Sequence, residues 1–208
     1  MRYYLLLCSF FLVGSAKEFT PFLSFSSSKS ELIRLYSAHK VLPLSGHTYR
    51  FDAQSCSVDG FVDGVANEPE MILWRHLVSE KIIGQGLRCM TEKVCLSSFS
   101  HRYYKGAMCC RKVSKSFRDM SADLHNIIPT VLKENVKELI ELENIVDKGA
   151  VARVYLYMMN QYGLNIEKKL LQKIRRWHKH YPVSEWEKEL NKKIFQLQGT
   201  FNPYIEKL

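Results

Sequence analysis

Three amphipathic stretches with clear start and stop signals occupy the last third of the chain, and they limit the folds open to it. The start signals are the N-cap residues Asp147, Asn165 and Ser184, the last in a capping box with Glu187. The stop signals are Gly163, Pro182 and Gly199. Apolar residues between these signals recur every three or four positions, which is the spacing of one helix face. We therefore predict three packed helices here, preceded by a helix that Pro129 opens and that runs through Leu142.

Residues 17 to 125 have a different texture, in which short apolar runs alternate with turn sequences such as VDG at 58–60 and 62–64. This pattern indicates few and short strands. The serine-rich sequence SFSSSKS at 24–30 is typical of a linker or a disordered arm. We therefore expect an N-terminal arm over 17–50, followed over 51–208 by one helix-rich α+β domain.

The first sixteen residues, MRYYLLLCSFFLVGSA, predict a secretory signal peptide over 1–16. One basic residue precedes an apolar run from Tyr3 to Val13, and small residues follow the run. The run is too short for a membrane span, which takes about twenty apolar residues. A lipid anchor on Cys8 is disfavoured, because Leu7 stands where a small residue would precede a lipidated cysteine. We expect a secreted or periplasmic protein with no membrane span.

Removal of the signal peptide leaves five of the six cysteines, namely Cys56, Cys89, Cys95, Cys109 and Cys110. In an oxidising compartment these residues are expected to form two disulfides and leave one free thiol, with a connectivity that the sequence leaves open. A zinc site is disfavoured, because no C-x-x-C pair occurs and adjacent cysteines fit tetrahedral coordination poorly.

The chain carries 30 Lys and Arg against 21 Asp and Glu, a net charge of +9, which favours a polyanion as partner. Much of this charge lies in one predicted helix, in the residues Lys168, Lys169, Lys173, Arg175, Arg176 and Lys179. Such a helix either follows a phosphate backbone or is a solvated face, and the second outcome is the commoner one.

Two short sequences hold residue types that suit phosphodiester chemistry. MILWRHLVSE, at 71–80, reads as a buried strand that carries Arg75 and His76 in its middle, and SADLHNIIPT, at 121–130, places Asp123, His125 and Asn126 together. An imidazole that activates water and an amide oxygen that holds a hard cation are the parts of a one-metal nuclease site. Taken alone, the same residues are more often a core histidine and a helix cap.

Three motifs near the C-terminus carry a family resemblance: GAVARVYLYMMNQYGLNI at 149–166, WHKHYPVSEWE at 177–187 and QGTFNPYI at 198–205. WRHLV at 74–78 and ADLHNIIP at 122–129 add to it. From about Asp52 onwards the chain resembles bacterial endonuclease I, a family of periplasmic or secreted nucleases with a ββα-metal (His-Me finger) core. The resemblance implies a monomer that hydrolyses phosphodiester bonds of DNA, and of RNA as a further substrate, without sequence specificity.

The resemblance also assigns roles to single residues. His76 matches the general base of the family, Asn126 its metal ligand, Asn135 the asparagine of an N-x-x-R motif, and Trp74 a packing residue of the site. Arg153 and Glu187 match family positions too, but their helical setting indicates a structural role.

Departures from the family pattern affect the metal site above all. Arg75 stands in place of the glutamate ligand to Mg²⁺, Ala107 in place of the phosphate-holding arginine, Glu138 in place of the arginine of N-x-x-R, and Ser79 in place of a proline. Exchange of a carboxylate for a guanidinium predicts that Mg²⁺ binds weakly or not at all. Adjacent strand residues also point to opposite faces, so Arg75 and His76 share a site only where the strand ends or bulges.

Two functional interpretations follow from these departures. In the first, the chain is an endonuclease in which Arg75 stabilises phosphate charge while His76 activates water, unless Asp123 or Glu80 supplies the lost carboxylate. In the second, it is a pseudonuclease, a basic protein that binds nucleic acid or another partner without cutting it. A basic interaction protein unrelated to nucleases is disfavoured by the C-terminal motifs.

Overall fold

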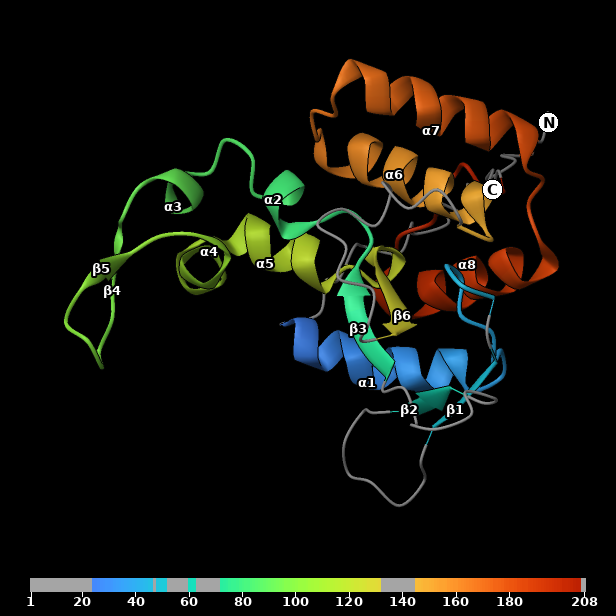
Figure 1. Ribbon diagram of the computed structural model, residues 1–208, viewed down its shortest axis with the longest axis horizontal. Coiled ribbons are helices and arrows are strands. Elements are labelled where there is room, and N and C mark those ends of the chain that lie inside the picture. Colours follow the sequence, from blue (N-terminus) through green and yellow to red (C-terminus); the bar gives the residue numbers. More distant parts are fainter. Residues whose placement is uncertain (1–23, 47, 52–59, 63–71, 132–144, 207–208) are drawn as a thin grey trace, which may run out of the picture.

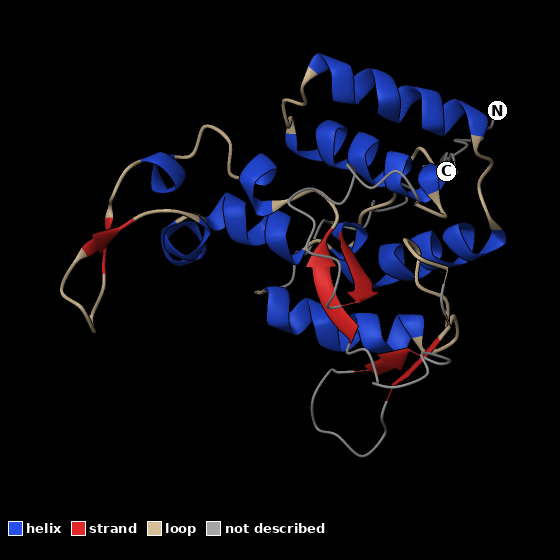
Figure 2. Cartoon of the chain, in the orientation of Figure 1, coloured by secondary structure: helices blue, strands red, loops and turns tan. Residues whose placement is uncertain are grey.

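The computed structural model describes residues 24–46, 48–51, 60–62, 72–131 and 145–206. These residues form a helix-rich α+β fold in which three two-stranded sheets are accompanied by helices (Figures 1 and 2). The α+β class predicted from the sequence is therefore confirmed. The predicted signal peptide, Cys56, Asn135 and Glu138 lie outside the described residues.

The elements of the N-terminal and central parts are α1 (Phe25–Tyr36), β1 (Tyr49–Phe51), β2 (Gly60–Val62), β3 (Ile72–His76), α2 (Glu80–Ile83), α3 (Arg88–Thr91), β4 (Cys95–Leu96), β5 (Tyr103–Tyr104), α4 (Ala107–Val113), α5 (Lys115–Ala122), the 3₁₀ turn η1 (Leu124–Asn126) and β6 (Ile127–Val131). The C-terminal helices are α6 (Lys148–Tyr162), α7 (Lys168–His180) and α8 (Glu185–Gln198).

The three C-terminal helices follow the sequence signals closely. The side chain of Asp147 caps α6 by accepting from Ala150 N, and Gly163 ends that helix with φ 65°. Ser184 and Glu187 form the predicted capping box at the start of α8. One start was predicted wrongly: α7 begins at Lys168 with Glu167, not Asn165, at the N-cap position.

The prediction of a linker at 24–30 is also wrong. Ser24 and Ser27 form a capping box, so the serines begin α1 rather than an arm. The helix then buries Leu32, Leu35 and Tyr36 in a core cluster that includes Ile72 and Trp74 of β3. In Figure 1 the start of β3 lies across α1. The folded core therefore includes part of the predicted arm.

Strands β3 and β6 form an antiparallel pair with an uninterrupted register from Ile72↔Val131 to His76↔Ile127. Pro129 lies opposite Trp74 within this pair, so the prediction that Pro129 opens a helix is wrong. A proline is tolerated in a two-stranded sheet because both strands are edges. This pairing brings the two sequences singled out for chemistry side by side.

Two disulfides fasten the segment between β3 and α5. Cys89 is bonded to Cys110, and Cys95 to Cys109. The adjacent cysteines Cys109 and Cys110, both buried in α4, thus tie α4 to α3 and to β4. This agrees with the predicted number of bridges and supplies the connectivity that the sequence leaves open.

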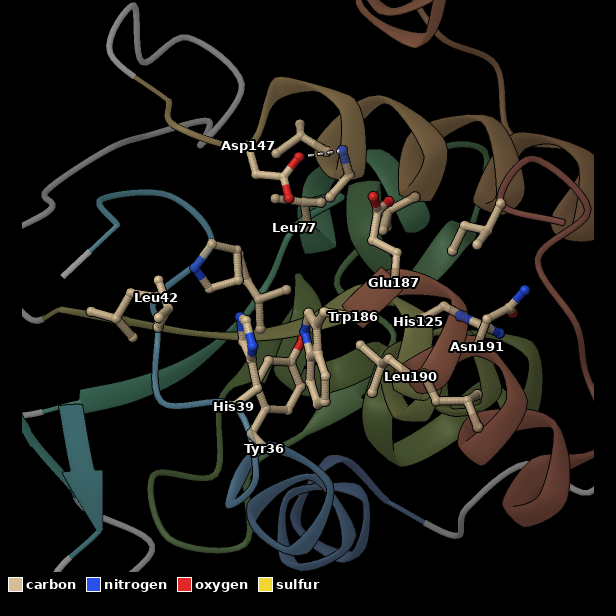
Figure 3. A pocket seen from close by; sticks show the side chains of 18 of the residues that line it. Tyr36, His39, Leu42, Leu77, His125, Asp147, Trp186, Glu187, Leu190 and Asn191 are labelled. Atoms are coloured by element: carbon tan, nitrogen blue, oxygen red, sulfur yellow. Dashed lines mark hydrogen bonds between the residues drawn. The ribbon is translucent and has the colours of Figure 1, made fainter. Parts of the chain in front are cut away.

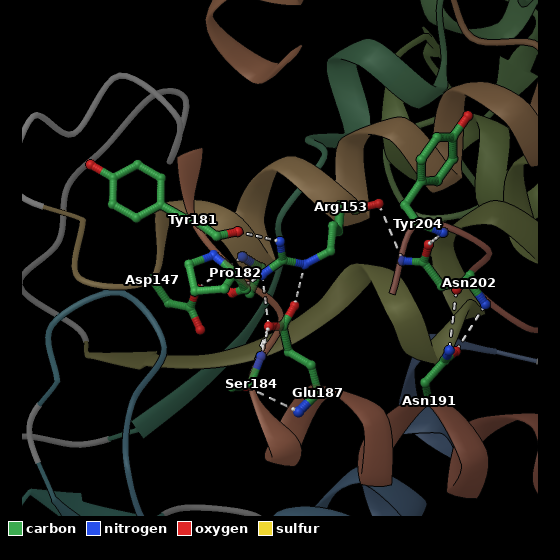
Figure 4. A network of polar contacts seen from close by, with 10 residues as sticks. Asp147, Arg153, Tyr181, Pro182, Ser184, Glu187, Asn191, Asn202 and Tyr204 are labelled. Carbon is green, nitrogen blue, oxygen red and sulfur yellow. Dashed lines mark hydrogen bonds and ion pairs between the residues drawn. The ribbon is translucent and has the colours of Figure 1, made fainter. Parts of the chain in front are cut away.

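A buried ion pair joins α6 to α8 (Figure 4). Arg153, 1% exposed, donates from Nε and Nη2 to the two carboxylate oxygens of Glu187 at 2.6 and 2.7 Å. Its guanidinium also donates to the carbonyl oxygens of Tyr181 and Pro182, in the turn between α7 and α8. Such a fully bonded pair fixes the arrangement of helices, in line with the structural role predicted for both residues.

No helix in the described part of the chain has both the length and the apolar character needed to cross a membrane.

Candidate functional site

His76 is the last residue of β3, and its ring is held on two sides. Nε2 lies 2.8 Å from the carbonyl oxygen of Ser121 at the end of α5. Because a carbonyl only accepts, Nε2 carries the proton and Nδ1 carries the lone pair. The ring of Phe25, from α1, packs at 4.5 Å between centroids and leaves the His76 side chain 9% exposed. The structure thus presents His76 as a fixed imidazole with a basic Nδ1.

Burial keeps the pKa of His76 below its ordinary value. The Ser121 hydrogen bond and the carboxylate of Glu80 raise the pKa, while the cations Arg111 and Lys29 lower it. The imidazole is therefore neutral at neutral pH, which is the form that can accept a proton.

Glu80 and Arg111 stand on the Nδ1 side of this ring. Oε1 of Glu80, in α2, lies 3.8 Å from Nδ1, and the same oxygen accepts from Nη2 of Arg111, in α4. The sequence indicated Glu80 only as a possible substitute carboxylate, and it gave no sign of Arg111. Their meeting depends on how α2 and α4 pack, which periodicity and spacing do not reveal.

Asn126 serves a backbone role in this conformation. Its Oδ1 accepts from Val78 N at 2.7 Å, and its Nδ2 donates to Val78 O at 3.1 Å. Both ends of the amide are thus bound to Val78, just beyond β3, and the Asn126 side chain is fully buried. Asn126 therefore positions the chain between His76 and Glu80, and its role as a metal ligand stays a prediction.

Asp123 is likewise used by the fold. Its Oδ2 accepts from the hydroxyl groups of Tyr157 and Tyr162, at 2.7 and 2.6 Å. Its Oδ1 accepts from Gln198 Nε2 and from the backbone of His125. His125 packs against Tyr157, and burial lowers its pKa. These residues form a buried hydrogen-bond network between η1, α6 and α8, in which both carboxylate oxygens of Asp123 already accept hydrogen bonds.

Arg75 lies one residue before His76 in the regular part of β3. The strand pairs with β6 over all five residues without a bulge, so alternation places Arg75 on the face opposite to Trp74 and His76. This agrees with the alternation expected of adjacent strand residues, and a shared catalytic role for Arg75 and His76 stays a prediction. Ala107 opens α4 and is half-buried.

The described residues around His76 do not fit a hard divalent cation. Mg²⁺ is usually held by one or two carboxylates and several waters. Near His76 the carboxylate of Glu80 is paired through Oε1 with a guanidinium, and the oxygens of Asn126 and Asp123 accept the hydrogen bonds given above. Among the described residues no group of three His, Cys, Asp or Glu side chains could hold a metal ion.

A basic groove runs between α2 and α7. Its lining includes the cations Lys81, Lys169, Lys173 and Arg176, and the acidic residue Glu167. The three cations of α7 recur at the spacing of one helix face. The groove therefore concentrates positive charge next to the helix that follows β3, a setting suited to a phosphate backbone.

A second cavity, of about 160 Å³, is mainly apolar and lies among α1, the loop that follows it, α6 and α8 (Figure 3). His39 stacks on Trp186 at its wall, with ring centroids 4.3 Å apart. Asp147 at its edge is occupied in capping α6. The lining lacks His76, so this cavity is separate from the histidine site.

The fold and site together define a disulfide-linked, helix-rich α+β protein with a neutral histidine at a strand end. Residues 142–208 match the family model described as Endonuclease I. An extracellular deoxyribonuclease of Aeromonas hydrophila is 28% identical, over 97% of this chain and 96% of the relative. A periplasmic deoxyribonuclease of the same organism is 28% identical (88% and 86%), and an Endonuclease-1 of Buchnera aphidicola subsp. Acyrthosiphon pisum is 24% identical (68% and 62%). By these matches the chain is similar to proteins of the endonuclease I family.

Proposed function

We propose that this protein is a secreted endonuclease that hydrolyses phosphodiester bonds of DNA without sequence specificity, with His76 as the general base. The observation that carries the proposal is the state of the His76 ring. Its tautomer is set by the 2.8 Å hydrogen bond to Ser121, and its basic nitrogen lies on the side of two charged residues. Relatives that are extracellular and periplasmic deoxyribonucleases support the substrate and the location, and the two disulfides suit an oxidising compartment.

The proposed hydrolysis needs one proton acceptor and one site of positive charge. A water molecule gives a proton to Nδ1 of His76 as its oxygen forms a bond to phosphorus. The bond from phosphorus to the departing sugar oxygen breaks, and that oxygen takes a proton from solvent. Burial keeps His76 in the neutral form that begins this sequence.

Within the α+β fold, we further propose a ββα-metal core. Strands β3 and β6 would be the two antiparallel strands of this core. His76 ends β3, and β6 begins directly after Asn126. The helix predicted from the sequence through Leu142, and Asn135 within it, lie outside the described residues. Endonuclease I proteins are in general metal-dependent, but the donor set around His76 does not fit a cation, and the proposed hydrolysis uses none.

The direct test is cleavage of supercoiled plasmid by the oxidised protein in Mg²⁺, in Mn²⁺ and in EDTA. Wild type should nick and linearise the plasmid, and His76→Ala should lose this activity. His101→Ala, a change at an exposed histidine, is the matched control. Full activity of His76→Ala would remove the histidine from the mechanism.

The alternative function is that of a nucleic-acid-binding protein that does not cut. The arginine at position 75 and the bound amide of Asn126 favour it. A wild type that binds duplex DNA but leaves plasmid intact in all three conditions would establish this alternative.

A further inference from the structure

Arg111 is a cation that lies near the basic nitrogen of His76. The proposed hydrolysis does not yet assign it a role. Its Nη2 and the Nδ1 of His76 contact the same oxygen of Glu80. The two nitrogens are therefore no more than about 7 Å apart, since an ordinary hydrogen bond is about 2.9 Å long. Reacting atoms meet at about 3–3.5 Å, so a water on Nδ1 and a phosphate on the guanidinium fit this span.

The side chains of Arg111 and Glu80 can both be reached from solvent. The Arg111 side chain is 43% exposed and that of Glu80 is 23% exposed. A guanidinium has five N–H donors arranged as a fork that matches two oxygens of a phosphate. The ion pair with Glu80 is described through one nitrogen, Nη2, which leaves the rest of the fork able to donate to a ligand.

We propose that Arg111 is the residue that binds the scissile phosphate, and that Glu80 positions it beside His76. This assignment rests on the proposed hydrolysis. When water adds to phosphorus, negative charge grows on the phosphate oxygens, and a preorganised cation at that place lowers the barrier. Arg111 is such a cation, because its partner Glu80 fixes it before the substrate arrives.

The geometry also explains how the site works with a donor set that does not fit a divalent ion. A guanidinium at Glu80 repels a second cation there, and it supplies positive charge itself. The charge that a hard ion would place on the phosphate is thus carried by a side chain of α4. Cleavage that persists in EDTA is the expected consequence.

A purely structural ion pair is the competing explanation. Exposed pairs add little to folding stability, and their removal hardly shifts the melting temperature. A structural role therefore predicts that loss of Arg111 changes neither activity nor melting temperature, whereas the proposed role predicts loss of activity in a folded protein.

The experiment compares wild type, Arg111→Gln and Arg111→Lys on a short fluorescent duplex and on plasmid, with melting temperature as the folding check. Arg88→Gln is the matched control, because Arg88 is an exposed arginine paired with Glu92. Arg111→Gln should lower kcat/KM by about 10²–10³-fold, and Arg88→Gln should leave it unchanged. Arg111→Lys should recover part of the loss, since it restores the charge without the fork.

The pH profile separates this role from a loss of packing. Lys29, Glu80 and Arg111 are the charged groups that act on His76, and of these Glu80 raises the His76 pKa while the two cations lower it. Loss of Arg111 should therefore raise the His76 pKa and move the acid limb of the kcat/KM profile to higher pH.

Each further outcome is decisive. An active wild type with an equally active Arg111→Gln variant would overturn the assignment and leave the proposed function standing. A wild type inactive on every substrate would overturn both. Cleavage that EDTA and Glu80→Gln abolish but Arg111→Gln preserves would show that Glu80 is a cation ligand, and Arg111 would lose its role.

Discussion

Oε1 of Glu80 lies 3.8 Å from Nδ1 of His76, while the carbonyl oxygen of Ser121 lies 2.8 Å from Nε2. The two contacts bind the ring nitrogens to different elements, α2 and α5. The carbonyl fixes the proton on Nε2, and the carboxylate raises the pKa of the ring against the effect of burial. The basicity of His76 is therefore set by residues that β3 itself does not contain.

Glu80→Gln should move the acid limb of the pH–rate profile to lower pH. The carboxylate raises the His76 pKa, so its neutralisation lowers that pKa, and the ring stays neutral in more acidic solution. The plateau rate should also fall, because Arg111 loses the partner that holds it. Cleavage of the fluorescent duplex across the pH range measures both effects, with Glu92→Gln as the control. An unmoved acid limb would mean that Glu80 does not act on His76.

The sequence predicted the parts of the fold that depend on local signals. Asp147, Ser184 and the glycines at 163 and 199 act within one helical turn, and they mark the ends of α6 and α8 as expected. The serines at 24–30 led to the wrong prediction of a linker, because serine is common both in linkers and at helix starts. The burial of Leu32 and Leu35 decides in favour of a helix.

The candidate site was predictable only in part, because its contacts depend on tertiary packing as well as on local sequence signals. His76 and Asn126 were found through family motifs, and the β3–β6 pairing does bring their sequences together. The commitment of Asn126 to Val78 and the approach of Arg111 to Glu80 arise from tertiary packing. A motif that fixes which residues occur does not fix which of their atoms are already hydrogen-bonded.

Reduction of the disulfides should destabilise the protein. Each bridge closes a loop, with separations of 21 residues for Cys89–Cys110 and 14 for Cys95–Cys109. Loss of a bridge should lower the free energy of unfolding by roughly 2–5 kcal/mol, measured by urea denaturation with and without reductant. Peptide mapping of oxidised protein should show these two linkages and one free thiol, on Cys56. Five free thiols in secreted material would contradict an oxidised fold.

Affinity for duplex DNA should fall steeply with salt and hardly vary with sequence, because phosphate contacts dominate it. The basic groove offers a sharp form of this test. A triple variant that changes Lys81, Lys169 and Arg176 to Gln should lower the slope of log K against log salt by roughly 2 to 3, because each phosphate that a cation neutralises adds roughly 0.9 to the slope.

The matched control for the groove changes Lys168, Arg175 and Lys179 to Gln. These residues are exposed on α7 but do not line the groove, and the net charge changes by the same amount. Its slope should fall by less than about 1, since side chains that do not line the groove would not contact the phosphates bound there. Equal slopes for the two triple variants would show that the overall charge of the protein, and not the groove, attracts DNA.

Arg75→Glu tests whether the site can be returned to a carboxylate form by one substitution. The unbroken register of β3 with β6 directs residue 75 away from the face of His76, and the Asn126 oxygen is already bound to Val78 N. We therefore expect no gain of Mg²⁺-stimulated cleavage and a smaller loss of activity than in Arg111→Gln. Plasmid cleavage in Mg²⁺ and in EDTA measures both. If Arg75→Glu instead gained fast cleavage that EDTA abolishes, residues 75 and 76 would have to meet at the strand end, and Arg75 would be the substituted ligand of an inherited metal site.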